Sequence, residues 1–175
     1  MGELRLLLGD DHAMLRHGLK KILEDRHDWR VVAEAGNGRD AVREAMALKP
    51  DIAVLEIGMP LLNGLEATRQ IVRHLPSVRV LILSMHSDQA YVSEAVQAGA
   101  KGYVLKESAA AELVEAISAL ASGKSFFSPP VAELVCHDYT RRLTAKGITD
   151  PYEALSERER EVLQLVAEGR SSKDI

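Results

Sequence analysis

Short apolar runs alternate with amphipathic stretches of helical length five times in the first 122 residues. The apolar runs are LRLLL at 4–8, RVVAEA at 30–35, DIAVL at 51–55, VRVLIL at 78–83 and GYVL at 102–105, and each is typical of a buried strand. The helical stretches are Ala13 to Glu24, Gly38 to Leu48, Gly64 to His74, Asp88 to Ala98 and Ala109 to Ser122. Parallel strands need crossover connections, and right-handed crossovers place helices on both faces of a sheet. The alternation therefore predicts an α/β domain with a five-stranded parallel sheet over residues 1–122.

The pattern changes after residue 122. GKSFFSPP is interpreted as a loop, and helical spacing then predicts a linker helix within residues 123–152 from Val131, Leu134, Val135, Tyr139 and Leu143. Ser156 and Glu159 have the spacing of a capping box before another helix, which Gly169 ends. RSSKDI leaves room for only one further helical turn. We therefore expect residues 153–175 to be the start of a second, all-α unit that is cut short.

Composition and charge exclude several kinds of protein. Hydrophobic residues make up 46% of the 175, which is enough for a full core. The 22 Lys and Arg against 26 Asp and Glu give a net charge of −4, so the whole molecule has no basic field to hold nucleic acid. A single cysteine, Cys136, excludes an internal disulfide framework and fits the reducing cytoplasm. No stretch is long enough to span a bilayer, so no membrane association is expected.

Polar side chains follow four of the five predicted strands. Asp10 and Asp11 come after the first strand, Glu56 after the third, Ser84 after the fourth and Lys106 after the fifth. In an open parallel sheet, ligands bind at the carboxyl ends of the strands. Carboxylates hold Mg²⁺, and a lysine and a hydroxyl can bind phosphoryl oxygens. The set therefore predicts a place where Mg²⁺ and a phosphoryl group meet.

A simpler explanation holds for any one of these residues, because loops lie at the surface and are polar. Asp11 can instead cap the helix that starts at Ala13. The two adjacent aspartates favour a site, because like charges side by side repel each other without a cation. The six histidines show no spacing typical of a zinc site and are interpreted as ordinary residues.

The sequence resembles a known family. LLLGDD, DIAVLEIGMPLLNGLEATRQI, LILSMHS and AGAKGYVLK are similar to the receiver domain of bacterial two-component response regulators. FFSPPVAEL and LSEREREVLQLVAEGRSSKDI resemble the linker and the helix-turn-helix start of the NarL/FixJ (LuxR-type) branch. The resemblance implies a flavodoxin-like, doubly wound sheet of strand order 2-1-3-4-5, and a cytoplasmic transcription regulator that takes a phosphoryl group from a sensor histidine kinase.

The resemblance also implies roles for individual residues. Asp10 and Asp11 match the acidic pocket, and Asp11, Glu56 and the Gly58 carbonyl match the metal ligands. Ser84, Tyr103 and Lys106 match the switch hydroxyl, the switch aromatic residue and the lysine of the family.

One position departs from the family pattern. Glu56 stands where the family has the aspartate that becomes phosphorylated, and its carboxylate extends about 1.5 Å further. Misplacement by about 1 Å can reduce a rate on the order of a hundredfold, so we expect poor phosphoryl acceptance at Glu56. Two interpretations remain open. Glu56 is either a partial mimic of the phosphorylated state, because it has fewer charges and oxygens than a phosphoryl group, or a substitution that abolishes signalling.

The predicted function is a signalling module and not an enzyme. The alternative is a small Mg²⁺-dependent phosphotransferase or phosphatase that uses Asp10, Asp11 and Glu56. A homodimer is expected, through the region from Asp88 to Ser122 or through the linker helix. Residues 123–175 have eight basic and nine acidic side chains, and no recognition helix fits at their end. We therefore expect DNA to be a partner of the intact parent and not of this chain.

Overall fold

The computed structural model of the chain describes the backbone of residues 2–145 and the side chains of residues 2–137. The elements in chain order are β1 (Leu4–Gly9), α1 (Ala13–Glu24), β2 (Trp29–Ala35), α2 (Gly38–Leu48), β3 (Ile52–Glu56), α3 (Gly64–His74), β4 (Arg79–Ser84), α4 (Gln89–Ala98), β5 (Gly102–Leu105), the 3₁₀ turn η1 (Lys106–Ser108), α5 (Ala109–Ala121), β6 (Phe126–Phe127) and α6 (Pro129–Ala145). The predicted alternation of strands and helices is confirmed, with boundaries within one residue for α1 to α5.

The strands form one parallel sheet of order β2-β1-β3-β4-β5-β6. The order of the first five strands is as expected, but the prediction of five strands and of a loop at GKSFFSPP is wrong. Phe126 and Phe127 pair with Gly102 and Tyr103 of β5, and both phenylalanines are buried. Two residues are too few to show the alternation by which a strand is recognised in a sequence.

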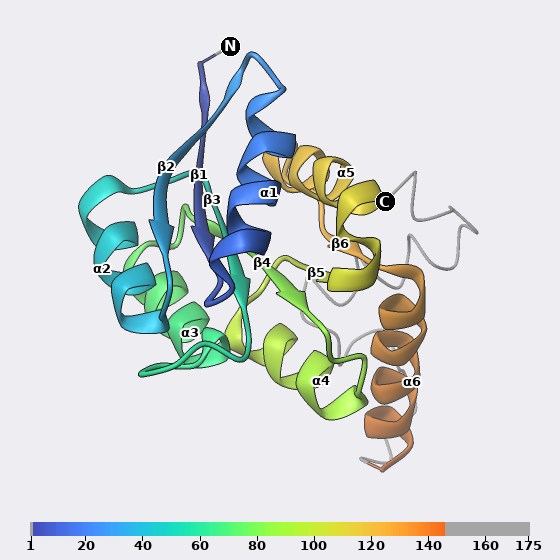
Figure 1. Cartoon of the computed structure of the whole chain (residues 1–175). Coiled ribbons are helices and arrows are strands. Elements are labelled where there is room, and N and C mark those ends of the chain that lie inside the picture. The colour runs from blue at the N-terminus through green and yellow to red at the C-terminus, as the bar shows by residue number, and fades with distance from the viewer. Residues whose placement is uncertain (1, 146–175) are drawn as a thin grey trace.

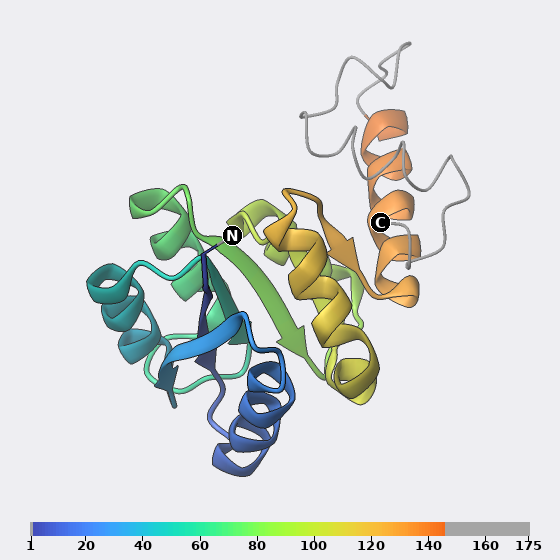
Figure 2. The same ribbon diagram turned by 90° about the horizontal axis from the view of Figure 1, so that it is seen from above.

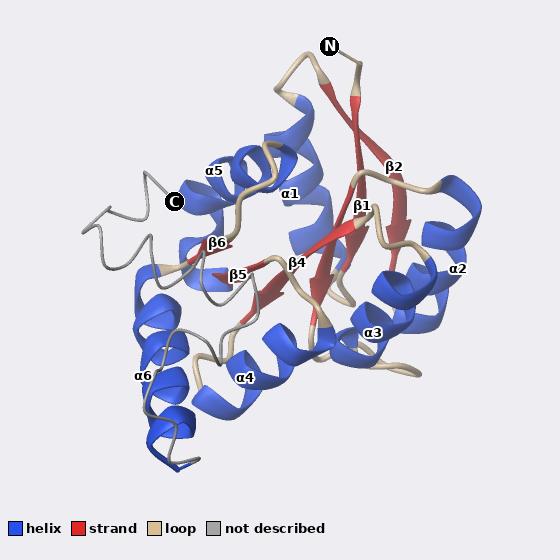
Figure 3. Cartoon of the chain, turned by 180° about the vertical axis from the view of Figure 1, so that it is seen from behind, coloured by secondary structure: helices blue, strands red, loops and turns tan. Residues whose placement is uncertain are grey.

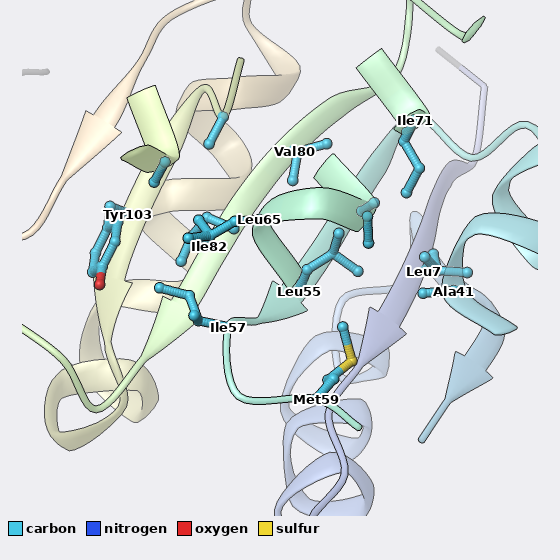
Figure 4. Packing of buried hydrophobic residues seen from close by; sticks show 14 of the residues in the cluster. Leu7, Ala41, Leu55, Ile57, Met59, Leu65, Ile71, Val80, Ile82 and Tyr103 are labelled. Atoms are coloured by element: carbon cyan, nitrogen blue, oxygen red, sulfur yellow. The ribbon is translucent and has the colours of Figure 1, made fainter. Parts of the chain in front are cut away.

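Helices cover both faces of the sheet (Figures 1 and 2). One apolar core lies between the sheet and α1 and α5, and the other lies between the sheet and α2, α3, α4 and α6. Successive residues of a strand point to opposite faces, so Leu6 and Leu8 belong to the first core and Leu7 to the second. Figure 4 shows this second core, where Leu7, Leu55, Ile82 and Tyr103 come from four neighbouring strands.

Helix α6 lies alongside α4 and next to β6 (Figures 1 and 3). Val131 is completely buried, and Ala132, Leu134 and Val135 pack against the second core. The predicted linker helix is therefore confirmed, and its first turns contribute to the core of the α/β domain. None of the described helices is long and apolar enough to cross a membrane. The predicted start of the helix-turn-helix unit, residues 153–175, lies outside the described residues.

Candidate functional site

The strand register brings the polar residues at the strand ends to one edge of the sheet. Gly9 pairs with Leu55, so Asp10 follows β1 next to Glu56, the last residue of β3. Glu56 pairs with Leu83 and Ser84 pairs with Leu105, which places Ser84 and Lys106 at the ends of the next two strands. The sequence prediction that these side chains share one edge therefore agrees with the fold.

Lys106 joins two buried carboxylates. Its Nζ lies 2.8 Å from Oδ2 of Asp10 and forms a second ion pair with Oε2 of Glu56. The side chains of Lys106, Glu56 and Asp10 are 7%, 7% and 4% exposed, so both ion pairs are shielded from water. Dissolved salt weakens a buried ion pair much less than a pair at the surface. The loss of one partner of a buried pair leaves an uncompensated charge.

The surroundings of Lys106 have opposing effects on its charge. Burial disfavours the charged ammonium, but the hydrogen bonds with Asp10 and Glu56 and the charges of both carboxylates outweigh burial, so the pKa of Lys106 is raised. The lysine is therefore a fixed cation at neutral pH. It balances one of the negative charges at this edge of the sheet.

Glycines let the backbone fit closely around Glu56. The amide of Gly58 donates a 3.0 Å hydrogen bond to Oε1 of Glu56. A Cβ on Gly64, the first residue of α3, would lie 2.0 Å from the Glu56 carbonyl oxygen. Both oxygens of the Glu56 carboxylate are thus engaged within the chain, one with Lys106 and one with the Gly58 amide.

A second group of ligand atoms lies beside the lysine bridge. Asp10, Asp11 and His12 each have a possible metal-ligating atom within 4.8 Å of the other two. Nδ1 of His12 is 2.9 Å from Oδ1 of Asp11 and 3.3 Å from Oδ1 of Asp10, and the His12 amide also donates to Asp10 Oδ1 over 2.8 Å. His12 was not predicted as a metal ligand from the sequence. A single histidine has no spacing signal, and only its position after two aspartates distinguishes it.

The two aspartates fit Mg²⁺, which prefers carboxylate oxygens and keeps several waters. The predicted third carboxylate, Glu56, is not among the clustered ligand atoms found in the described part of the chain, whereas Asp10 belongs to the cluster although it also pairs with Lys106. The donor set therefore supports a cation on Asp10 and Asp11 more than on Glu56.

Arg16 binds the backbone of Asp10, and neither its residue type nor its position in the sequence indicated this contact. Its Nη1 donates a 2.5 Å hydrogen bond to the Asp10 carbonyl, and its Nε lies 3.2 Å from Oε2 of Glu34 on β2. Lys20 binds the other oxygen of Glu34 at 2.9 Å, and this hydrogen bond is the main reason that the pKa of Glu34 is lowered. Arg16 of helix α1 thus connects the carbonyl of Asp10 to Glu34 of β2.

Ser84 and Tyr103 meet at the chain segment that follows β4. The buried Ser84 hydroxyl accepts a 3.1 Å hydrogen bond from the amide of His86. The ring of Tyr103 is completely buried, and its hydroxyl donates a 2.6 Å bond to the His86 carbonyl. Burial is the main cause that raises the pKa of Tyr103 to about 12, while a hydrogen bond with Ser84 acts in the opposite direction. The His86 ring stacks on Tyr91 with centroids 4.5 Å apart.

Comparison with known proteins identifies relatives of the chain. A family model described as "Response regulator receiver domain" matches residues 6–118. The chain is 35% identical over 185 residues to "Transcriptional regulatory protein DegU" of Brevibacillus brevis, covering 99% of this chain and 78% of the relative. It is 39% identical over 173 residues to "Transcriptional regulatory protein LiaR" of Bacillus subtilis, covering 98% of this chain and 80% of the relative.

A solved structure agrees with these matches. The crystal structure of a two-component response regulator of the LuxR family from Aurantimonas sp. superposes with a TM-score of 0.75 and 38% identity. The match covers 79% of this chain and 99% of that chain. The similarity therefore extends beyond the residues of the family model to part of the segment that follows the receiver.

Proposed function

The chain belongs to the response regulator receiver domain family, and on this premise we propose that it is a transcription regulator whose receiver is held by Glu56 in a phosphate-independent state. The observation that carries the proposal is the pairing of Lys106 with both Glu56 and Asp10. In the family resemblance, Glu56 occupies the position of the phospho-acceptor aspartate and Lys106 that of the lysine beside it.

The geometry of Glu56 supports a partial mimic of the phosphorylated form. Its carboxylate places a negative charge next to Lys106, where a phosphoryl group on a shorter aspartate would place its own oxygens. It also accepts the amide of Gly58. The mimic is partial because a carboxylate has one negative charge, whereas a phosphoryl group has nearly two.

The same contacts oppose phosphoryl transfer onto Glu56. An oxygen that attacks phosphorus must lie in line with the leaving group. The contacts of Glu56 with Lys106 and Gly58 hold a carboxylate that extends about 1.5 Å further than that of an aspartate, so its oxygens are misplaced for this attack. The alternative function, a Mg²⁺-dependent phosphotransferase or phosphatase, needs Glu56 to be available in the same way. The names of the relatives are those of regulators and not of enzymes, which also favours the signalling function.

Magnesium fits the two aspartates of the site. Asp10 and Asp11 would hold the cation, which when bound neutralises phosphoryl oxygens and so supports phosphorylation of a receiver with aspartate at position 56. Asp10 keeps its bond to the His12 amide and Arg16 holds its carbonyl, so the backbone of the metal site is ordered by the chain itself.

The exposed residues around this edge fit a partner protein. Met14 of α1, Leu61 before α3 and Met85 after β4 are 90%, 70% and 70% exposed. All three follow strands that end at the polar edge of the sheet, so a partner that delivers a phosphoryl group to the pocket would meet exposed apolar side chains there. A sensor histidine kinase is the partner that the family implies. The relatives are named transcriptional regulators, which supports DNA as a partner of the protein. We also propose a cytoplasmic location and a homodimer.

The test is intact mass after incubation with Mg²⁺ and a small-molecule phosphodonor. The chain as given and the Glu56→Asp variant are measured side by side, with Lys106→Met in the Glu56→Asp background as the control for pocket-dependent labelling. We expect one phosphoryl group on Glu56→Asp, and none on the chain with Glu56. Labelling of the chain with Glu56 to the same extent contradicts the proposal.

Sedimentation separates the two interpretations of Glu56. A mimic gives the chain the same concentration-dependent association as the phosphorylated Glu56→Asp variant. If the chain instead behaves as the unphosphorylated Glu56→Asp variant, Glu56 blocks signalling without imitating the phosphorylated state.

A further inference from the structure

Ser128 is a completely buried serine that connects three elements of the fold. Its amide donates a 2.9 Å hydrogen bond to the carbonyl of Tyr103 in β5. Its hydroxyl accepts a 3.2 Å bond from the amide of Leu105, and donates to Oε2 of Glu112 in the first turn of α5. The residue therefore joins β5 and α5 to the start of α6, which begins at the next position.

The sequence after Ser128 explains why its hydroxyl is available for these contacts. A serine before a helix usually uses its side chain to accept from a backbone amide of the first turn. Here the first two helical residues are Pro129 and Pro130, which have no N–H groups. The next two amides, of Val131 and Ala132, donate to the Ser128 carbonyl over 2.8 and 3.0 Å. The helix start is satisfied by the backbone, and the hydroxyl is left to bind β5 and α5.

The hydroxyl meets β5 immediately before the lysine of the site. Leu105 is the last residue of β5, and Lys106 is the first residue of η1. Lys106 is in turn fixed by Asp10 and Glu56. Lys106 therefore directly follows the residue whose amide binds Ser128, and one hydrogen bond connects that amide to the residue before α6.

Glu112 sets the direction of this contact. A hydroxyl has one proton, and the proton of Ser128 goes to the Glu112 carboxylate, so its lone pairs face the Leu105 amide. A negatively charged carboxylate is also favourable near the N-terminal ends of α5 and α6. Without Glu112 the hydroxyl is free to rotate, and the contact with β5 loses its fixed geometry.

We propose that Ser128, oriented by Glu112, is a positioning residue that couples the contacts of Lys106 in the carboxylate pocket to the packing of helix α6 on α4. The proposal rests on the proposed function, because it takes the Glu56–Lys106 contact as the input of the switch. Coupling of this kind is reciprocal: what changes the pocket changes α6, and what loosens α6 changes the pocket.

Hydrogen exchange of the α6 amides tests the coupling with the full chain. The pocket is perturbed by Glu56→Gln, which removes the charge next to Lys106 and keeps the shape of the side chain. We expect this change to speed the exchange of α6 amides about fivefold or more when Ser128 is present, the lower end of usual coupling factors. In the Ser128→Ala background the same change is expected to have less than about a twofold effect.

Two further variants make the comparison specific. Ser118→Ala is the matched control, because the Ser118 hydroxyl donates over 2.8 Å to Val114 within α5 and does not reach β5. It should leave the fivefold response intact. Glu112→Ala keeps Ser128 but removes the acceptor of its proton, and should reduce the response. If Ser128→Ala does not fold, the comparison between Glu112→Ala and Ser118→Ala decides the proposal.

The possible results are distinguishable. A pocket response that disappears in Ser128→Ala and remains in Ser118→Ala supports the coupling. An equal response in all backgrounds overturns it, because Ser128 is then only part of the packing of α6, and leaves the proposed function in place. No response of α6 to Glu56→Gln in any background also overturns the coupling, and leaves the proposed function to the intact-mass and sedimentation measurements.

Discussion

The substitution Lys106→Met removes the cation that two buried carboxylates share. Methionine keeps most of the volume of the side chain but provides no charge, so Asp10 and Glu56 are left close to each other without their ammonium. Removing one partner of a buried ion pair costs about 3–5 kcal/mol, and the exposed fractions of 7% or less place these pairs in that class. For a chain of this size, that loss corresponds to a fall in Tm of roughly 6–20 °C.

A matched control uses a lysine pair near the surface. Lys20 and Glu34 approach to 2.9 Å, as Lys106 and Asp10 approach to 2.8 Å, but their side chains are 33% and 32% exposed. A pair of this kind contributes about 0–1 kcal/mol, so Lys20→Met should lower Tm by only a few degrees. The two variants therefore compare a buried and a partly exposed ion pair whose nitrogen–oxygen distances are nearly equal.

Urea unfolding at pH 7 measures the free energy of unfolding of both variants and of the unchanged chain. We expect Lys106→Met to lose several times more free energy of unfolding than Lys20→Met. Equal losses for the two variants would refute the assignment of Lys106 as the shared cation.

Three further outcomes follow from the structure. The phenolate absorbance of the four tyrosines should include one component with a pKa of about 12, absent in Tyr103→Phe, because burial raises the pKa of Tyr103. The free energy of unfolding should decrease above about pH 10, measured by urea titration. Folding raises the pKa values of Lys106 and Tyr103 from 10.5 and 10.0, so their contributions are complete below those values and are lost as the pH rises through the folded values. Gly64→Ala should destabilise the chain by about 1–3 kcal/mol or more, because its Cβ would meet the Glu56 carbonyl at 2.0 Å. Gly18 lies in α1, and no atom lies within 4 Å of a Cβ added to it. Gly18→Ala should therefore stabilise the chain by about 0.5–1 kcal/mol in the same assay, and a decrease in the free energy of unfolding would contradict this reasoning.

The residues at the carboxyl edge of the sheet could be predicted from the sequence, because the end of each apolar run marks the end of a strand. Four of the five apolar runs are followed by polar residues, and parallel pairing brings the ends of the strands together. The order of the residues was therefore enough to expect Asp10, Glu56, Ser84 and Lys106 at one edge. A metal role for Glu56 was predicted both from the carboxylates at this edge and from the resemblance. Glu56 lies outside the cluster of ligand atoms at Asp10, Asp11 and His12 in the described part of the chain, and its oxygens contact Lys106 and Gly58.

Contacts between side chains and distant backbone could not be predicted in the same way. The bond of Ser128 to Leu105 joins residues 23 positions apart, and neither residue type nor spacing indicates it. The same holds for Arg16, whose contact with the Asp10 carbonyl depends on the path of the loop after β1. Periodicity detects which face of an element is buried, but it contains no information on which polar atom meets which.

The length of the Glu56 side chain determines which residues of the pocket it can contact. Strand β4 lies between β3 and β5, so a bridge from Glu56 to Lys106 must pass the end of β4 across two strand spacings, roughly 10 Å. Two long side chains span that gap, and the residue at the end of β4 is the small Ser84. An aspartate at position 56 would withdraw its carboxylate by about 1.5 Å, and would leave Lys106 with Asp10 as its near partner. The withdrawn carboxylate would leave room beside Gly58 and Lys106, which is where a phosphoryl group on that aspartate would have to lie. In the proposed function, the extra methylene group of Glu56 brings a carboxylate into contact with Lys106 in the absence of phosphate.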